Sequence, residues 1–233
     1  MPIITKDFST GYQNEKIITS VSLSLEKSEW LGIIGANGSG KSTFLKGISR
    51  ILDAYSGNAY LYGEDIHLSS TQEIAKKVSI LPQLNRLNLP LTVFELVCLG
   101  RSPHKKWWEL DLDENDLSKV EQSIALTDMT ALKNKAVDAL SGGQRQRAFL
   151  SLALAQDARI LLLDEPTTFL DIRYQLQFLD LLKKLNKEQK LSIITVIHDV
   201  NLAARYCDRL AVIKSGELLA IDKPREVLTK ELM

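Results

Sequence analysis

The chain has little of what stabilises secreted proteins or anchors membrane proteins. Its 233 residues include two cysteines, Cys98 and Cys207, which lie far apart and show no metal-binding spacing. We therefore expect a protein of a reducing compartment, without disulfides. No apolar run approaches the ~20 residues needed to cross a bilayer. The N-terminus also lacks the basic region and apolar stretch of a signal peptide, so any membrane role is expected to depend on a partner.

The chain also has no net charge at pH 7, with histidine counted as neutral. The 29 basic residues equal the 29 acidic residues in number, which argues against a protein that binds nucleic acid through bulk positive charge. The sequence contains no internal repeat and no low-complexity segment. Its length allows one domain or two, because ~100–200 residues per domain is only a guide.

The order of apolar patterns predicts an α/β fold with a helical insertion. Four β-like segments come first, over residues 3–8, 17–25, 30–34 and 59–62. Residues 84–139 differ, because they carry helical patterns, an acidic patch at 111–116 and no buried-strand run. Short apolar runs return at 160–163 and 192–197 between helical stretches, which is typical of buried parallel strands. A closing hairpin is expected over 211–221.

A glycine-rich segment follows the expected strand at 30–34 and reads Gly35-Ala36-Asn37-Gly38-Ser39-Gly40-Lys41-Ser42-Thr43. A helical pattern from Phe44 to Leu52 comes next, so the segment has the strand–loop–helix context of a phosphate-binding P-loop. The glycines let backbone amides wrap the phosphates, Lys41 reaches the β- and γ-phosphates, and Ser42 can ligate Mg²⁺. The residues predicted to bind nucleotide here are Gly35, Asn37, Gly38, Ser39, Gly40, Lys41, Ser42 and Thr43.

A second chemical signal is the apolar run at 160–163 that ends in Asp164-Glu165-Pro166. Carboxylates at the C-terminal end of a buried strand lie where open α/β sheets place their ligands. Asp164 is expected to hold Mg²⁺, and Glu165 to orient and polarise an attacking water as general base. A solvated loop is the alternative for such a strand end, and the P-loop makes that alternative weaker.

The third signal is a second glycine-rich anion site at Leu140-Ser141-Gly142-Gly143-Gln144-Arg145-Gln146-Arg147. Ser141 is expected to cap a helix that runs to Gln156, and the two glycines let backbone amides approach a ligand. Exposed amides at a helix N-terminus form an anion site. One ATP does not need two such sites from one chain, so we expect a head-to-tail dimer. The alternative is a serine-capped surface helix.

His198 follows the expected strand at 192–197 in the same way that Gly35 and Asp164 follow theirs. A lone histidine is more often a structural residue. Parallel strands, however, would bring these three ends together on one edge of the sheet. We therefore expect His198 to belong to the same site.

Together these motifs resemble those of the ATP-binding-cassette ATPases, in which the sequence LSGGQ is the signature motif. The resemblance covers essentially the whole chain and implies an α/β fold. It comprises a P-loop NTPase (RecA-like) core with an antiparallel β subdomain and an inserted helical subdomain. The core and β subdomain would be residues 1–83 and 160–233, and the helical subdomain residues 84–159, in a single ATP-binding domain.

The resemblance also implies roles for individual residues. His198 would be the switch histidine at the γ-phosphate, and Gln83 would touch Mg²⁺ and the attacking water. Asp171 matches the aspartate that meets the partner subunit, and Tyr12 the aromatic that stacks on adenine. Three of these residues have non-functional alternatives: Gln83 as an exposed turn glutamine, Asp171 as a helix N-cap, and Tyr12 as a turn tyrosine. The implied catalytic set includes Lys41, and Ser141, Gly142, Gly143 and Gln144 would bind the partner's nucleotide.

Residues 91–104, 167–172 and 198–208 look like the ATPase subunits of bacterial iron-siderophore, haem and cobalamin importers. This resemblance implies a peripheral protein on the cytoplasmic face of the membrane, working with ATP and Mg²⁺ as a homodimer. Integral permease subunits would dock near residues 84–101, and a substrate-binding protein would deliver the cargo. The alternatives are a zinc, manganese or phosphate importer, a non-transport cytosolic ATPase, and a degenerate cassette. Relatives usually extend further, so a piece beyond Met233 is expected to be absent.

Overall fold

Two sheets and a helical region make up the computed structural model, which describes residues 1–233 except 14, 84–89, 107–110, 169 and 230–233. Six strands form the main sheet in the order β10-β9-β3-β8-β7-β6. They are β3 (Trp30–Ile34), β6 (Val78–Leu81), β7 (Ile160–Asp164), β8 (Ser192–Val196), β9 (Arg209–Lys214) and β10 (Glu217–Asp222). The neighbouring pairs from β9 to β6 are parallel, and β10 pairs with β9 as the expected antiparallel hairpin.

The second sheet is antiparallel, in the order β2-β1-β4-β5. Its strands are β1 (Ile3–Tyr12), β2 (Glu15–Leu25), β4 (Ala54–Leu61) and β5 (Glu64–Asp65). The prediction of a strand at 59–62 misplaced both of its ends. β4 begins five residues earlier because it pairs with β1 back to Thr10, and it ends before Tyr62, whose positive φ of 52° turns the chain.

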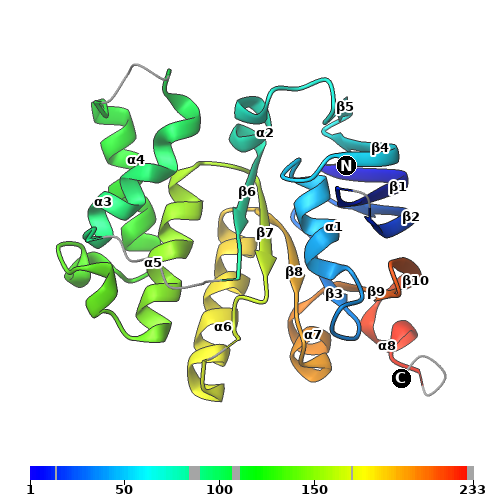
Figure 1. Cartoon of the computed structure of the whole chain (residues 1–233). Coiled ribbons are helices and arrows are strands. Elements are labelled where there is room, and N and C mark those ends of the chain that lie inside the picture. The colour runs from blue at the N-terminus through cyan, green and yellow to red at the C-terminus, as the bar shows by residue number, and fades with distance from the viewer. Residues whose placement is uncertain (14, 84–89, 107–110, 169, 230–233) are drawn as a thin grey trace.

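Helices flank the main sheet and extend beyond one of its ends (Figure 1). They are α1 (Lys41–Ile48), α2 (Thr71–Lys77), α3 (Val93–Cys98), α4 (Glu114–Leu126), α5 (Gly142–Ala155), α6 (Ile172–Glu188), α7 (Val200–Tyr206) and α8 (Pro224–Val227). Three 3₁₀ helices accompany them: η1 (Leu99–His104), η2 (Thr130–Leu132) and η3 (Val137–Ala139). Capping boxes start α2, α3, α4 and α5, so side chains satisfy their first free amides.

One detail of the helical predictions was wrong. The helix after the P-loop ends at Ile48 and does not reach Leu52, because Arg50 takes a left-handed φ of 58° that ends the helix. Within the acidic patch at 111–116, Asp116 is buried in an ion pair with Arg101. Among the described residues of the region, the expected absence of a strand is confirmed apart from an isolated bridge between Thr92 and Ala136.

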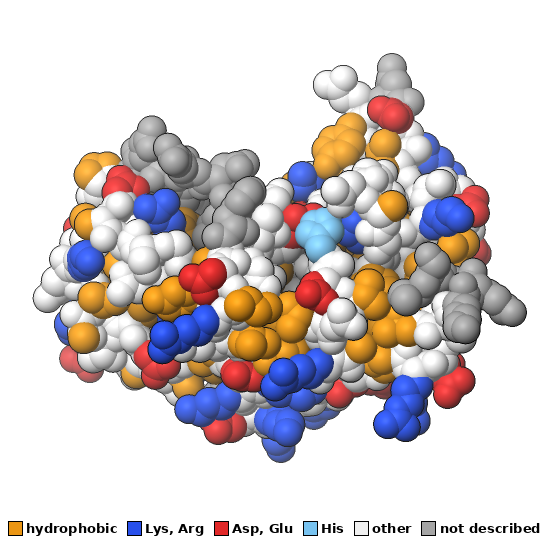
Figure 2. All heavy atoms as spheres, turned by 90° about the horizontal axis from the view of Figure 1, so that it is seen from below, with side chains coloured by type: hydrophobic (Ala, Val, Ile, Leu, Met, Phe, Trp, Pro, Cys, Tyr) orange, Lys and Arg blue, Asp and Glu red, His pale blue; other side chains and the backbone are white. Residues whose placement is uncertain are grey.

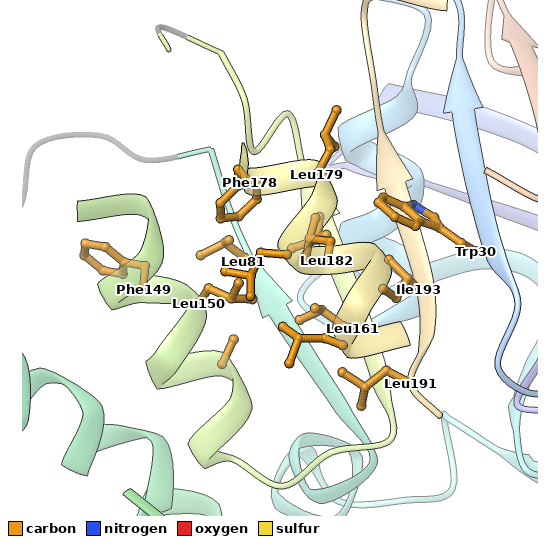
Figure 3. Packing of buried hydrophobic residues seen from close by; sticks show 14 of the residues in the cluster. Trp30, Leu81, Phe149, Leu150, Leu161, Phe178, Leu179, Leu182, Leu191 and Ile193 are labelled. Atoms are coloured by element: carbon orange, nitrogen blue, oxygen red, sulfur yellow. The ribbon is translucent and has the colours of Figure 1, made fainter. Parts of the chain in front are cut away.

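Strands β3, β7 and β8 of the main sheet are buried on both faces, as their near-continuous apolar runs predicted. Alternate residues of β7 divide between two cores: Leu161 and Leu163 face one, and Ile160 and Leu162 face the other. The first core extends along one face of the sheet, from α6 to α5 and on into the helical region (Figure 3). The second joins α1 to the antiparallel sheet. Because α5 packs on α3 and α4 as well as on β6 and α6, the helical region is anchored firmly beside the sheet.

Candidate nucleotide-binding site

The carboxyl edge of the main sheet gathers the predicted site residues. β3, β8, β7 and β6 are successive parallel neighbours. Gly35, His198, Asp164 with Glu165, and Gln83 therefore follow strands that end at one edge, as expected. Figure 2 looks at the molecule from the side on which β6 ends, where apolar side chains gather in the middle of the face around acidic side chains and a histidine.

The P-loop has the backbone that its glycines predicted. Gly35, Gly38 and Gly40 have φ of 151°, 75° and 100°, a region that side chains with a Cβ rarely adopt. A Cβ on Gly35 would lie 2.0 Å from the carbonyl oxygen of Ile213, so this position also requires glycine for space. The glycines let the loop curl before α1 begins at Lys41, and the free amides of that helix start point to an anion site.

Lys41 lies within the curled loop. Its ammonium donates to the carbonyl oxygens of Gly35, at 3.0 Å, and Ala36, at 2.8 Å. Burial lowers the pKa of Lys41, while the nearby carboxylates of Glu165 and Asp164 act in the opposite direction. A lysine held this way is a point charge close to where the loop places phosphate groups.

Asp164 and Ser42 form an oxygen-rich corner beside the loop. The Ser42 hydroxyl donates to Asp164 Oδ1 at 2.7 Å, and the carboxylate is buried. Burial raises the pKa of Asp164, the bond from Ser42 lowers it, and the charge of Glu165 raises it further. A hydroxyl and a carboxylate are the hard oxygen ligands that Mg²⁺ takes together with phosphate oxygens. The donor set therefore fits that ion.

Glu165 is the point on which the other candidate residues converge. Its Oε1 lies 2.6 Å from His198 Nε2, and its Oε2 accepts a bond from Gln83 Nε2 at 3.0 Å. Thr168 Oγ1 also donates to Oε2, at 3.3 Å. Glu165 has a left-handed φ of 50°, which is uncommon for a residue with a side chain and often accompanies functional sites. The site thus holds one carboxylate between a histidine, an amide and a hydroxyl.

Thr168 and Lys46 were missed from the sequence. Thr168 reaches Glu165 only because the chain turns after β7, with the Thr168 amide bonded to the Glu165 carbonyl. Lys46, in the second turn of α1, lies 3.2 Å from the Tyr12 hydroxyl and 5.6 Å from the centre of its ring. The only available signal for either was spacing: three residues after the catalytic candidate and five after the P-loop lysine.

Tyr12 and the P-loop share one cleft of about 310 Å³. The residues that line it are Tyr12, Ile17, Asn37, Gly38, Gly40, Lys41, Ser42, Thr43 and Glu165. Tyr12 is 43% exposed, which leaves much of its surface open to a ligand. The cleft therefore offers an aromatic surface at one side and phosphate-binding groups at the other, the two chemistries that a nucleotide presents.

The signature segment lies apart from this cleft. Ser141 caps α5: its hydroxyl accepts from the Gln144 amide at 3.4 Å, and Gln144 Oε1 accepts from the Ser141 amide at 3.1 Å. Ser141 and Gly142 are exposed. Among the described residues that line the 310 Å³ cleft, none comes from 141–144. The signature segment therefore lies outside the cleft that the P-loop lines.

The start of α6 lies beside the signature. A Cβ built on Gly143 would lie 3.3 Å from Tyr174, and one on Gly142 would lie 3.6 Å from Leu170. Asp171 caps α6, with its carboxylate accepting from the Tyr174 amide at 3.1 Å, so the alternative role of a helix N-cap is present. Ile172 and Tyr174 are 61% and 47% exposed, which leaves apolar side chains on the surface next to the signature.

Comparison with known proteins decides the family. The model of the family described as "ABC transporter" matches residues 18–168 of this chain. The chain belongs to the ABC transporter family. It is an ATP-binding, ATP-hydrolysing subunit of that family.

Relatives match this ABC ATPase over nearly its full length. The achromobactin transport ATP-binding protein CbrD of Dickeya dadantii (strain 3937) is 42% identical over 99% of this chain and 86% of its own. The iron(3+)-hydroxamate import ATP-binding protein FhuC of Bacillus subtilis (strain 168) is 42% identical over 98% and 85%. The ABC transporter cassette MJ0796, solved as a dimer and as a dimeric post-hydrolysis state with ADP and Pi, is 29% identical. It covers 96% of this chain and 99% of its own, with TM-scores of 0.80 and 0.79.

The described part of the ABC ATPase contains no helix long and apolar enough to cross a bilayer. Residues 84–89 of the expected docking region lie outside the described residues. Of the remainder, Leu99 and Gly100 line a second cavity of about 360 Å³ between η1, α2 and the end of α1. Ile51, Ile74 and Ile80 line it from the core side, so an apolar groove separates the helical region from the core.

Proposed function

We propose that this chain powers the import of ferric siderophores through a permease in a bacterial membrane. The observation that carries the proposal is the match to two siderophore import ATPases over 98–99% of the chain, which leaves little room for a different architecture. The intact set of Lys41, Asp164, Glu165 and His198 supports an active motor and argues against a degenerate cassette.

In the proposed reaction, Glu165 accepts a hydrogen bond from the attacking water and polarises it toward the γ-phosphate. Gln83 and His198 already contact this carboxylate, and both positions suit contact with the water and the γ-phosphate. Lys41 stabilises negative charge on the β- and γ-phosphates, and Tyr12 stacks on the adenine. General-base assistance of this kind is worth ~10²–10⁴ in rate.

Ser42 and Asp164 would hold Mg²⁺, with Gln83 on the side of Glu165. When bound, the ion would neutralise charge on the β- and γ-phosphates. The proton on a neutral Asp164 would compete with a cation. The raised pKa of this carboxyl therefore predicts that Mg²⁺ binding weakens as the pH falls toward that pKa.

Two chains would form a head-to-tail dimer in which Ser141, Gly142, Gly143 and Gln144 of one chain cover the nucleotide of the other. The separation of the signature from the chain's own cleft supports this arrangement, as does the dimeric cassette of similar fold. The exposed Ile172 and Tyr174 beside the signature would be covered in the dimer.

A helix of the permease would occupy the 360 Å³ groove. Its apolar lining from Ile51, Ile74, Ile80 and Leu99 suits the apolar face of a helix. The same docking model predicts that charged residues at Leu87 or Leu89, which lie outside the described residues, would uncouple the permease. Docking would hold the chain at the cytoplasmic face of the membrane.

The test is uptake of labelled ferric siderophore by a strain that lacks this gene. Uptake should fall, and the wild-type gene should restore it while a Glu165→Gln gene should not. Normal siderophore uptake with a defect in zinc, manganese, haem or cobalamin uptake would refute the substrate assignment. The ATPase assignment would then still stand.

A further inference from the structure

The wall of the apolar groove is tied to the far end of the signature helix by a buried arginine. Arg101 lies in η1, between groove residues Gly100 and Ser102, and is 3% exposed. Its Nε donates to Asp116 Oδ1 of α4 at 2.9 Å, and its Nη1 donates to the Ala155 carbonyl, at the end of α5, at 2.8 Å. One guanidinium therefore joins three helices.

Other contacts also hold η1 against α4 and the end of α5. Lys105 pairs with Asp116 from the other side. His104 Nε2 lies 2.8 Å from the Gln156 carbonyl, one residue beyond α5. Gly100 packs so closely on α5 that an added Cβ would lie 2.4 Å from the Leu152 carbonyl oxygen. The groove wall therefore has no room to move independently of the last turn of α5.

α5 begins at the signature and ends at these contacts. A helix of 14 residues is ~21 Å long and transmits displacement along its length as a stiff element. A partner helix that presses on Leu99 or Ser102 would therefore displace the signature as well. Because Arg101 can donate to two acceptors in fixed geometry, it suits this junction better than a lysine would.

We propose that Arg101 is a positioning residue that couples the permease groove to the signature of the ATP site. Arg101 itself contacts neither the nucleotide cleft nor, in the proposed transporter, the permease. It makes η1, the start of α4 and the end of α5 move as one unit. This inference rests on the proposed function, because the groove must receive a permease for the coupling to matter.

The test uses the whole transporter, purified through a tag on this chain and placed in liposomes with the siderophore-loaded binding protein. Arg101→Met should leave basal ATPase and the KM for ATP close to wild type. The permease-dependent stimulation should fall at least about fivefold, the scale of a typical coupling free energy. Arg101→Lys, which keeps the pair with Asp116 but not both bonds, should lose part of the stimulation.

The matched control is Lys119→Met. Lys119 pairs with Asp157 at 3.0 Å and also links α4 to the region just after α5, but this pair is exposed. Stimulation should be unchanged in this variant, because exposed pairs contribute little. Full stimulation in both Arg101 variants, or an equal loss in the control, would overturn the proposal. Absence of siderophore-dependent stimulation in the wild-type transporter would instead refute the proposed function.

Hydrogen exchange in the isolated chain tests the junction without any permease. Arg101→Met should raise exchange of the η1 amides and of the last turn of α5 together. An increase confined to η1 would mean that the two segments do not move as one unit, and would overturn the proposal whatever the transported cargo. If Arg101→Met does not fold, the same comparison with Arg101→Lys decides it.

Discussion

The P-loop half and the signature half of the molecule each present backbone amides at a glycine-rich helix start, but in different surroundings. Around the P-loop, charged side chains from several strands converge: Lys41 is buried in the loop, and Glu165 touches both Gln83 and His198. At the signature, Ser141 and Gln144 bond to each other's backbone at an exposed helix start. The P-loop half therefore gathers charged and polar side chains, whereas the signature half presents an exposed helix start.

The two halves differ in whether one chain supplies all of the residues that gather there. The P-loop half is built from within one chain, because parallel strands bring its residues to a single edge. The signature half is held rigidly from behind by α5 and beside it by α6, yet it faces outward. In the proposed dimer, a second chain would complete this site.

The largest expected effect comes from breaking the P-loop half at its chemical centre. Glu165→Gln should slow hydrolysis by roughly 10²–10⁴, or about 3–5 kcal/mol of barrier, because the amide cannot accept a proton from water. ATP binding should persist, and an ATP-bound dimer should accumulate in size-exclusion chromatography. Glu188→Gln, at the exposed end of α6, is the control. Wild-type turnover in Glu165→Gln would remove this residue from its role.

Breaking the signature half should give a different pattern. Ser141→Arg should abolish measurable hydrolysis, a loss of at least about 10²–10³, the scale of losing a preorganised donor at a reacting phosphate. ATP binding by the isolated chain should stay close to wild type, since Ser141 does not line its own cleft. Fluorescent-nucleotide titration measures this, with Lys41→Ala as the reference for lost binding. Equal loss of binding in both variants would mean that the signature serves its own chain.

A smaller effect is expected at the groove that lies behind the signature half. Leu99→Asp places a charge among apolar groove residues, so siderophore uptake should fall at least about fivefold. Basal ATPase of the free chain should be unchanged, because Leu99 lies outside the nucleotide cleft. Leu219→Asp, at another exposed apolar position, is the control. Equal uptake in the two variants would argue against docking at this groove.

The smallest effect is on stability, and it appears only in acid. Burial alone would raise the pKa of Asp116, but the bonds from Lys105 and Arg101 outweigh it and lower that pKa from 3.8 to about 2. The folded pKa is below the unfolded one. The carboxylate therefore adds about 2 kcal/mol to the free energy of unfolding above pH ~4, and this is lost as the pH falls toward 2.

Thermal unfolding at several pH values measures that contribution. Asp116→Asn should be less stable than wild type near neutral pH, and the difference should shrink between pH ~4 and 2. Asp111→Asn, which changes an exposed carboxyl nearby, should follow the wild-type profile. A stability gap between Asp116→Asn and wild type that does not change with pH would rule out this ion pair as its source.

The sequence could predict which strands end at the carboxyl edge of the sheet, but not which side chains contact one another there. Short apolar runs before Gly35, Asp164 and His198 located three strand ends, and strand pairing then places them together. The convergence of Gln83 and His198 on Glu165 was expected only as shared membership of a site. Periodicity carries no information on which side chains meet across a sheet edge.

Long-range polar contacts were the other limit. Arg101 belongs to a stretch that was noted only for its resemblance to importers, and Asp116 to the acidic patch at 111–116. Their buried pair depends on how η1, α4 and α5 pack, which no local pattern encodes. The position of Lys46 beside Tyr12 likewise depends on the antiparallel sheet lying close to α1.

The central claim, that each ATP site is completed by a second chain, is tested most directly by mixing two inactive variants. Lys41→Ala lacks a working P-loop, and Ser141→Arg lacks a working signature. A hybrid dimer contains one site in which the P-loop of the Ser141→Arg chain meets the intact signature of the Lys41→Ala chain. We predict that the mixture hydrolyses ATP although neither variant does so alone. No recovery, with hybrid dimers verified by native mass spectrometry, would contradict the account.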